Sequence, residues 1–385
     1  MHYIKSISFL TILFLASCSP KMGKEASTTG NEPVKGDFRS MAPKAGPARA
    51  IEIGKSTNYT LSNGLKVIVV ENHKIPHVSY QLSIDHDPIL EKEKSGVIDM
   101  TGTLIGNGTT TKSKAEINEA VDYIGANLST NGTGGFASSL TKHTDKILAL
   151  FSDVILKPSF PQSEFDKIKT QTLSSLQTQK DEPNSISHNV SNALTFGSNH
   201  PYGEITNEIT VSNINLQDCI DYYKANFKPG NAYLIIVGDI TPDVAKAKAE
   251  KYFGSWSAGT IPPHTYDAPK PLDKTAVAFV DKAGAVQSLI NIQYAVDLKP
   301  GSADDIPCRV MNSILGSGFS GRLFKNLRED KAYTYGAYSS LSSDRLVGSF
   351  SANASVRNAV TDSAVTQFMV ELNRMKNEPV TKTEL

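Results

Sequence analysis

The side chains best suited to metal or nucleophilic chemistry in this 385-residue sequence are its eight histidines and three cysteines. His73 and His77 have the four-residue spacing of a ligand pair. They flank Pro76 between two predicted strands, however, which favours exposed loop histidines over metal ligands. The other histidines that we considered are scattered, at positions 143, 188 and 200. A catalytic zinc ion needs three protein ligands, and this pattern does not supply them.

Two cysteines, Cys219 and Cys308, lie in segments that we assign to different domains, with no Cys-x-x-Cys spacing and no neighbouring histidine. We predict two buried free thiols, and a disulfide between them is the alternative in an exported protein. The glycine-rich segment 316–321 lacks the Gly-Lys-Ser/Thr ending of a phosphate-binding loop. It therefore predicts a turn between helices.

The charges balance, with 39 basic and 39 acidic residues, so nucleic acid is not an expected partner. Residues 1–18 have the order of a secretory signal peptide: Lys5, an apolar run, and then Leu-Ala-Ser-Cys ending at Cys18. That ending resembles the bacterial lipobox, which implies a lipid anchor on Cys18; an incidental cysteine near a cleavage site is the alternative. Residues 19–50 are rich in Gly, Pro and Lys and predict a disordered linker. We expect an exported lipoprotein of the cell envelope, periplasmic or anchored to the outer membrane.

The remaining sequence predicts strands and helices that must position any site. Alternating residues around Asn63-Gly64 predict a hairpin over 60–70, and further strands are predicted at 78–84 and 234–237. Helical spacing predicts helices at 95–104, 114–124, 144–156 and 163–180. Strands and helices mix without regular alternation, which favours an α+β sandwich with mostly antiparallel sheets.

An internal repeat indicates two copies of one fold. The pattern that begins at Met100 recurs from Met311, at an offset of 211, and a second pair of matching segments has an offset of 220. We assign a first domain to 51–258, a Pro-rich linker to 259–274 and a second domain to 275–385. The second copy ends where the first continues for about 90 residues, so we expect it to be partial.

Seven short motifs occur together, in order, between residue 59 and the last residue. They are Asn63-Gly64-Leu65, Lys94-Ser95-Gly96-Val97, Gly108-Thr109, Asp181-Glu182-Pro183, His200-Pro201-Tyr202-Gly203, Phe227-Lys228-Pro229-Gly230-Asn231 and Val237-Gly238-Asp239. Their order and spacing resemble the insulinase (pitrilysin) family of zinc peptidases, especially its shorter bacterial members and the mitochondrial processing peptidase subunits. The resemblance implies two similar α/β-sandwich domains.

In that family, His-x-x-Glu-His on the first long helix holds zinc and provides the general base. In register, the three positions here are Asp99, Gly102 and Thr103, and the later glutamate ligand aligns with Ser174 or Ser175. The resemblance therefore implies that this chain holds no zinc and does not hydrolyse peptides by itself.

The resemblance also implies substrate-binding residues. Arg328 and Tyr335 match the family's second-domain Arg and Tyr, seven residues apart, whose side chains can donate hydrogen bonds to a substrate carbonyl. A solvated helix arginine and a tyrosine that fills a sheet face are the alternative. Asn127, Leu128 and Ser129 lie where the family presents an edge strand to an extended peptide, with an interior strand as the alternative.

Three hypotheses follow. The first is a zinc-less subunit of a two-chain peptidase, which lends Arg328 and Tyr335 to a zinc-bearing partner subunit that carries His-x-x-Glu-His. The second is a non-catalytic peptide-binding or scaffold lipoprotein. The third is an autonomous metallopeptidase with rearranged ligands.

Overall fold

The computed structural model describes residues 46–47, 54–270 and 274–385. Cys18, the predicted signal peptide and nearly all of the predicted 19–50 linker lie outside these residues. Within the part of the chain that is described, no helix combines the length and apolar character needed to cross a bilayer.

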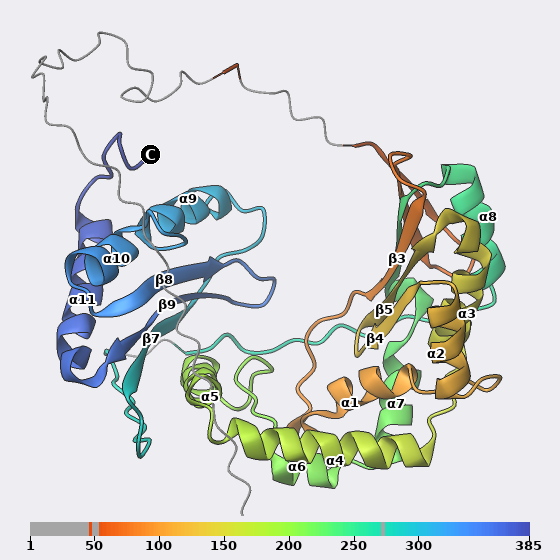
Figure 1. Cartoon of the computed structure of the whole chain (residues 1–385), viewed down its shortest axis with the longest axis horizontal. Helices are drawn as coiled ribbons and strands as arrows, with labels where there is room; N and C mark the ends of the chain where they lie inside the picture. The colour runs from red at the N-terminus through yellow and green to blue at the C-terminus, as the bar shows by residue number, and fades with distance from the viewer. Residues whose placement is uncertain (1–45, 48–53, 271–273) are drawn as a thin grey trace, which may run out of the picture. The chain divides into compact units, whose positions relative to one another are not determined.

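Six strands form the first sheet, in the order β1-β2-β6-β3-β5-β4 (Figure 1). All neighbouring pairs are antiparallel except β2 and β6, which run parallel. The predicted hairpin is confirmed as β1 and β2, with Gly64 in the left-handed region at φ +95°. The Asn63 amide nitrogen donates to the carbonyl oxygens of Phe253 and Trp256 at 2.9 and 3.1 Å, which fixes this turn to the end of α8 (Pro242–Phe253). The strands are β1 (Ser56–Thr60), β2 (Lys66–Glu71), β3 (His77–Ile84), β4 (Asn127–Asn131), β5 (Gly134–Leu140) and β6 (Ala232–Gly238).

Helices pack on one face of this sheet because alternate strand residues are apolar. Val67, Tyr80 and Leu82 are fully buried, and they join a core that includes Phe151 and Phe253 from the covering helices. Figure 1 shows α2, α3 and α8 on this face. The helices of this part are α1 (Val97–Ile105), α2 (Lys114–Tyr123), α3 (Thr144–Leu156), α7 (Leu216–Asn226) and α8 (Pro242–Phe253).

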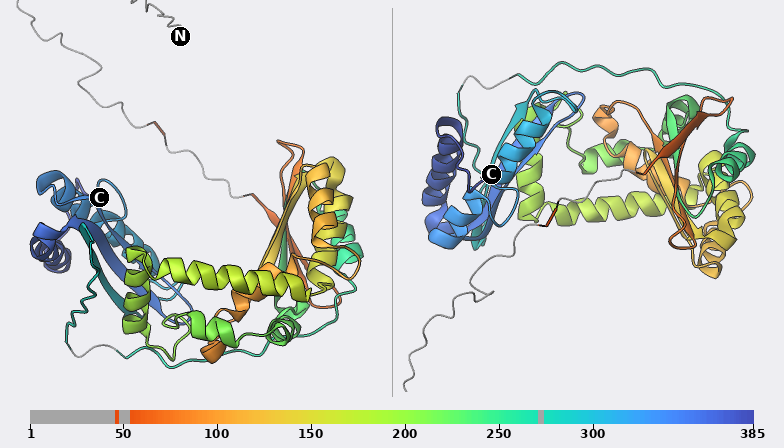
Figure 2. Two further views of the ribbon diagram at one scale, coloured as in Figure 1. Left: turned by 60° about the horizontal axis from the view of Figure 1, so that its bottom comes forward. Right: turned by 90° about the horizontal axis from the view of Figure 1, so that it is seen from above.

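A second apolar cluster joins α1 and α7 to two further helices, α4 (Gln162–Gln179) and α6 (Glu208–Asn213). The helix after α4 in the chain, α5 (Pro183–Phe196), has no residue in this cluster. Met100, Leu104 and Phe165 are buried in it. Pro183 occupies the first turn of α5, where its missing N–H is not needed. Figure 2 shows that α4 runs from the helices of the first sheet towards α5, and α5 contacts β7 (Gln287–Val296) of the second sheet.

The second sheet has three antiparallel strands in the order β7-β9-β8. Phe350 and Ala352 of β9 face the helices and pack near Phe368 and Leu323. Figure 1 shows α9, α10 and α11 together on that face. The elements are β7 (Gln287–Val296), β8 (Thr334–Ser342), β9 (Gly348–Arg357), α9 (Asp305–Leu315), α10 (Arg322–Phe324) and α11 (Thr361–Asn377).

The strand orders confirm the internal repeat. The order β3-β5-β4 in the first sheet matches β7-β9-β8 in the second, and each series is followed by one long helix, α3 or α11. Both described cysteines are free thiols, as predicted. Cys219 is buried, but the prediction of burial is wrong for Cys308, which is only partly covered on α9.

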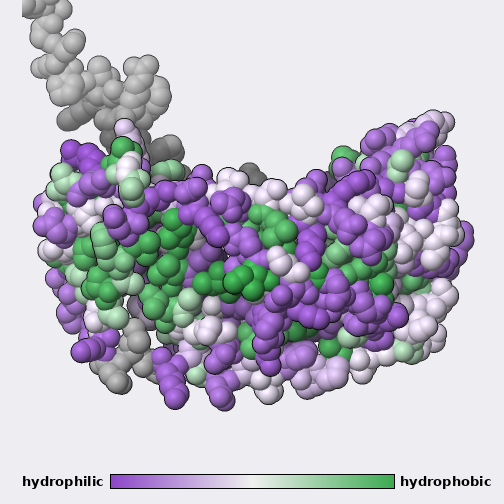
Figure 3. All heavy atoms as spheres, turned by 90° about the horizontal axis from the view of Figure 1, so that it is seen from below, coloured by the Kyte–Doolittle hydropathy of each residue, from purple (hydrophilic) through white to green (hydrophobic). Residues whose placement is uncertain are grey.

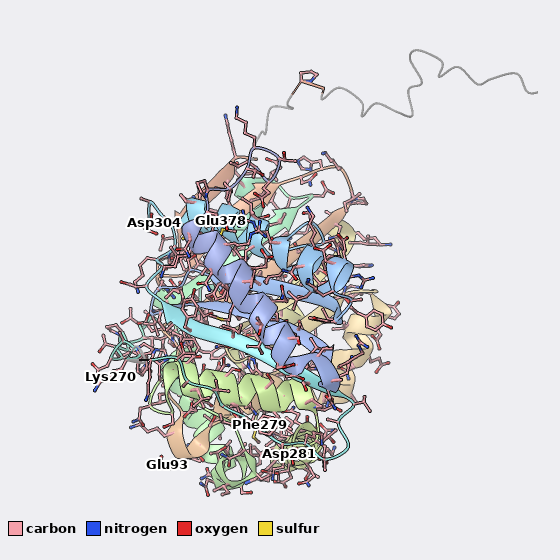
Figure 4. The ribbon with its side chains drawn as sticks, turned by 90° about the vertical axis from the view of Figure 1, so that its left-hand side faces the viewer. Glu93, Lys270, Phe279, Asp281, Asp304 and Glu378 are labelled. Atoms are coloured by element: carbon pink, nitrogen blue, oxygen red, sulfur yellow. The ribbon has the colours of Figure 1, made fainter. Side chains whose placement is uncertain are left out.

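The segment before β7 carries exposed apolar side chains. Val277, Phe279 and Val286 are 91%, 86% and 84% exposed. Figure 4 labels Phe279 and Asp281 beside α5, and the Lys282 ammonium lies 3.3 Å from the Asp181 carboxylate just before that helix. Figure 3 shows further apolar residues in patches between hydrophilic ones. The segment 277–286 is therefore not fully covered by other described elements.

Candidate functional site

Gly102 stands at the position of the family's general base. It lies where α1 meets the β4–β5 turn, and the two backbones touch there. Gly102 is buried, and a Cβ atom added to it would lie 2.1 Å from the Gly132 nitrogen and 2.3 Å from the Asn131 carbonyl carbon. The Thr130 hydroxyl donates a hydrogen bond to the Gly102 carbonyl oxygen at 2.7 Å. Glycine is therefore required for this close approach.

The other positions that the resemblance assigns to zinc also lack a ligand set. Asp99 is the one carboxylate among them, and the Thr103 hydroxyl donates to its carbonyl oxygen at 3.1 Å. On α4, the Ser174 hydroxyl donates to the Thr170 carbonyl oxygen at 3.0 Å, and Ser175 brings only a hydroxyl. Within residues 54–270 and 274–385, no three His, Cys, Asp or Glu side chains are grouped closely enough to hold a metal ion. These residues do not fit a catalytic zinc site.

A half-buried carboxylate stabilises the start of α1. Glu91 accepts hydrogen bonds from the backbone N–H groups of Gly96 and Ile98 at 3.1 and 2.9 Å. Burial raises the pKa of Glu91 to about 7, the nearby Glu204 and Asp99 carboxylates add to the rise, and the two N–H donors oppose it. The N-terminus of α1 is therefore sensitive to pH near neutrality.

The strand predicted to bind peptide lies at the edge of the first sheet. Among the described strands, β4 pairs only with β5, so its outer side keeps unpaired backbone groups. Asn127 and Ser129 are exposed and Leu128 is half-buried. The edge position is confirmed and the interior alternative is wrong, whereas peptide binding by these residues stays a prediction.

Arg328 and Tyr335 lie together at the start of the second sheet's edge strand. Arg328 sits in a single π-helical segment (Lys325–Asp330), and its guanidinium donates to the Tyr335 carbonyl oxygen. The guanidinium carbon also lies 5.2 Å from the centre of the Phe324 ring and 5.9 Å from that of Tyr335. Tyr335 is 84% exposed, so it does not fill a sheet face. Arg328 is exposed in a helical segment, and substrate binding by the two residues stays a prediction.

A β-bulge gives Tyr335 this exposure. The pairing of β8 with β9 shifts register between Thr334 and Ala337, so Tyr335 and Gly336 have no partner on β9. Tyr335 also lines a groove of about 580 Å³ between the second sheet and α5. The tyrosine hydroxyl is thus presented to the space beside the sheet, where a bound peptide could accept its hydrogen bond.

The histidines do not form a site with one another. The His73 imidazole lies 2.6 Å from both the Glu71 and Asp239 carboxylates, and these hydrogen bonds raise its pKa, first that to Asp239. His200 is buried beside Phe196. These histidines therefore have structural partners.

Apart from Tyr335, the residues that line the groove were not predicted from the sequence. Polar residues alternate with apolar ones along β9, a signal that predicts one polar sheet face. The sequence does not show that α5, more than 90 residues before β7, would form the opposite wall.

Two family models match most of the chain. Residues 66–206 match the insulinase family (peptidase family M16), and residues 213–385 match the peptidase M16 inactive domain. The chain belongs to the insulinase family. This confirms the resemblance that the seven motifs carry.

Two known sequences and one solved structure are similar to this chain. An uncharacterized zinc protease, YmxG, of Bacillus subtilis (strain 168) is 27% identical over 288 residues, which cover 73% of this chain and 69% of that protein. A non-peptidase homolog of Helicobacter pylori (strain ATCC 700392 / 26695) is 19% identical over 71% of this chain and 64% of its own length. The crystal structure of a peptidase M16 inactive domain from Pseudomonas fluorescens has a TM-score of 0.76 at 23% identity, covering 86% of this chain and 81% of that one. The structural likeness confirms the α+β fold.

Proposed function

We propose that this chain is the zinc-less subunit of a two-chain peptidase of the insulinase family. The observation that carries the proposal is an asymmetry between the two copies of the fold. At the zinc positions, Gly102 is in backbone contact with Gly132 and no ligand set remains. In the second copy, by contrast, Arg328 and Tyr335 are ordered against each other and exposed.

In this proposal, zinc and the general base come from a partner subunit that carries His-x-x-Glu-His. The free edge of β4 binds the peptide as an added strand through backbone hydrogen bonds. The Tyr335 hydroxyl and the Arg328 guanidinium donate hydrogen bonds to the substrate carbonyl group and to the charge that develops on its oxygen. This chain binds and orients the peptide, and its own residues do not activate water.

The test is reconstitution with a zinc-bearing family member co-purified from envelope extracts. Removing one oxyanion donor typically costs about 100-fold or more in kcat, so we expect losses of that order for Tyr335→Phe and for Arg328→Ala. Tyr123→Phe is the matched control, since Tyr123 is also 84% exposed but lies on α2. Full activity of both site variants, or the absence of any zinc-bearing family member in the purified complex, would overturn the proposal.

The second candidate is a peptide-binding or scaffold protein without turnover in any complex. It is favoured by the relative named as a non-peptidase homolog. The same preparation decides between them: peptide binding that persists with no partner and no cleavage supports the scaffold function.

We also propose that Cys18 is lipidated and anchors the protein in the cell envelope. The support is the signal-like order of residues 1–18. Metabolic labelling with a radioactive fatty acid should mark the full chain but not a Cys18→Ser variant. Equal labelling of the two, or a soluble wild-type chain after cell fractionation, would contradict the anchor.

A further inference from the structure

The groove beside Tyr335 is bounded by two elements from different parts of the chain. Its floor is the face of the β7-β9-β8 sheet that α9, α10 and α11 leave uncovered, and one wall is α5, which Figure 4 shows alongside β7. At about 580 Å³, it lies in the range of ordinary ligand sites.

The period of two along β9 explains why this floor is polar. Phe350 and Ala352 point to the helices and are buried. The alternate residues Ser351 and Asn353 therefore point the other way, into the groove. Leu289 and Ile290 of β7 also line the groove. Along β9, however, an apolar ligand would desolvate the polar side chains without replacing their hydrogen bonds, so this part of the floor favours polar groups.

A chain of carboxamide hydrogen bonds fixes the α5 wall to the floor. The Gln293 amide donates to the Asn192 side-chain oxygen at 3.0 Å, and the Asn291 amide donates to the Ser191 hydroxyl at 2.7 Å. The Asn192 amide nitrogen lies 3.0 Å from His188 Nε2 and donates to it. These bonds hold the groove in shape before any ligand binds.

Other carboxamides in the groove remain available to a ligand. Asn184, Gln287 and Asn353 form no side-chain hydrogen bond with any described residue. A carboxamide has two N–H donors and one acceptor oxygen, so it pairs with a peptide group or with another amide through complementary hydrogen bonds.

The decisive property is the absence of charge. Among the described residues that line the groove, none is Asp, Glu, Lys or Arg. A charged side chain that entered would lose hydration and meet no opposite charge among the residues that line the groove, whereas a neutral polar side chain would find hydrogen-bond partners there. We propose that the groove binds a peptide segment with uncharged polar side chains and discriminates against acidic and basic ones. This inference rests on the proposed function and specifies its substrate class.

The experiment measures binding of fluorescein-labelled nonapeptides of Ala and Ser to the full chain by fluorescence anisotropy. The central residue is Gln, Glu or Lys, and each series is repeated at low and high salt. We expect the Glu and Lys peptides to bind at least about tenfold more weakly than the Gln peptide at both salt concentrations. Non-specific attraction or repulsion would instead be screened by salt.

Two variants locate the discrimination in the groove. Asn353→Asp places a negative charge on the floor and should shift the preference towards the Lys peptide by about tenfold, since Asn353 is exposed there. Ser340→Asp is the matched control: Ser340 is exposed on β8 outside the groove lining, and its variant should keep the Gln preference.

The outcomes separate the two proposals. Equal affinity for the three peptides, or the same shift in both variants, overturns the inference while peptide binding stands. If none of the peptides binds, the peptide-binding function is overturned and the inference with it.

Discussion

Replacing Gly102 by alanine tests the backbone contact that separates this chain from a zinc-bearing family member. The new Cβ atom would lie 2.1 Å from the Gly132 nitrogen, whereas ordinary contact begins near 3.4 Å. The β4–β5 turn must therefore move by more than 1 Å, which would also stretch the hydrogen bond from Thr130 to the Gly102 carbonyl oxygen.

Three contributions decide the size of the effect. Overpacking costs about 1–3 kcal/mol and the strained hydrogen bond about 1 kcal/mol, whereas alanine gains about 1 kcal/mol over glycine in a helix. We expect a net loss of about 2 kcal/mol, seen as a fall in Tm of roughly 3 °C. The same clash should prevent Asp99→His, Gly102→Glu and Thr103→His together from creating a zinc site.

The assay is thermal unfolding followed by circular dichroism, with one control variant on α1 and one at the glycine that caps its C-terminus. Thr103→Ala changes an exposed side chain and should leave Tm nearly unchanged. Gly106→Ala places its Cβ atom 2.8 Å from a side-chain atom, the Thr130 hydroxyl, so it should cost less than Gly102→Ala. An unchanged Tm for Gly102→Ala, or stoichiometric zinc in the triple variant, would refute the steric argument.

Two further predictions concern stability. Asn63→Ala removes two hydrogen bonds that a buried side chain donates to the end of α8, and it should lower the free energy of unfolding by about 2 kcal/mol in urea titrations. A loss below about 0.5 kcal/mol would contradict a stabilising role for these hydrogen bonds. The pKa of Glu91 is raised from 4.5 to about 7 in the folded chain, so between these pH values the folded state binds more protons than the unfolded state. The free energy of unfolding therefore falls as pH rises through this window, by up to about 3 kcal/mol. Glu91→Gln should remove that part of the pH dependence in urea titrations at pH 5 and 7.5, and an equal slope in the variant would contradict it.

Much of the fold could be predicted because its signals are local. The Asn-Gly hairpin and the helices and strands around it follow from turn chemistry and from periods of 2 and 3.6 residues, which depend on neighbours in the sequence. The repeat predicts matching strand orders, and the two sheets confirm them. The loss of the zinc motif at Asp99, Gly102 and Thr103 is likewise visible from residue identity alone.

Residue identity also marked Arg328 and Tyr335, but it did not show how they interact. Whether the guanidinium pairs with the adjacent acids or with β8 depends on the π-helical segment and the bulge at 334–337, which have no simple sequence period. The close approach at Gly102 was also invisible, because it depends on the distance between a helix and a turn that are 30 residues apart.

The sequence by itself determined the family resemblance, the repeated α+β architecture and the missing zinc ligands, since each depends on residue type and spacing. Only the tertiary structure decided that β4 is an edge strand and that α5 lies against β7. These arrangements come from long-range packing, in which many weak contacts between distant segments act together. The uncharged groove beside Tyr335 exists only because that packing brings residues of α5 and of the second sheet together.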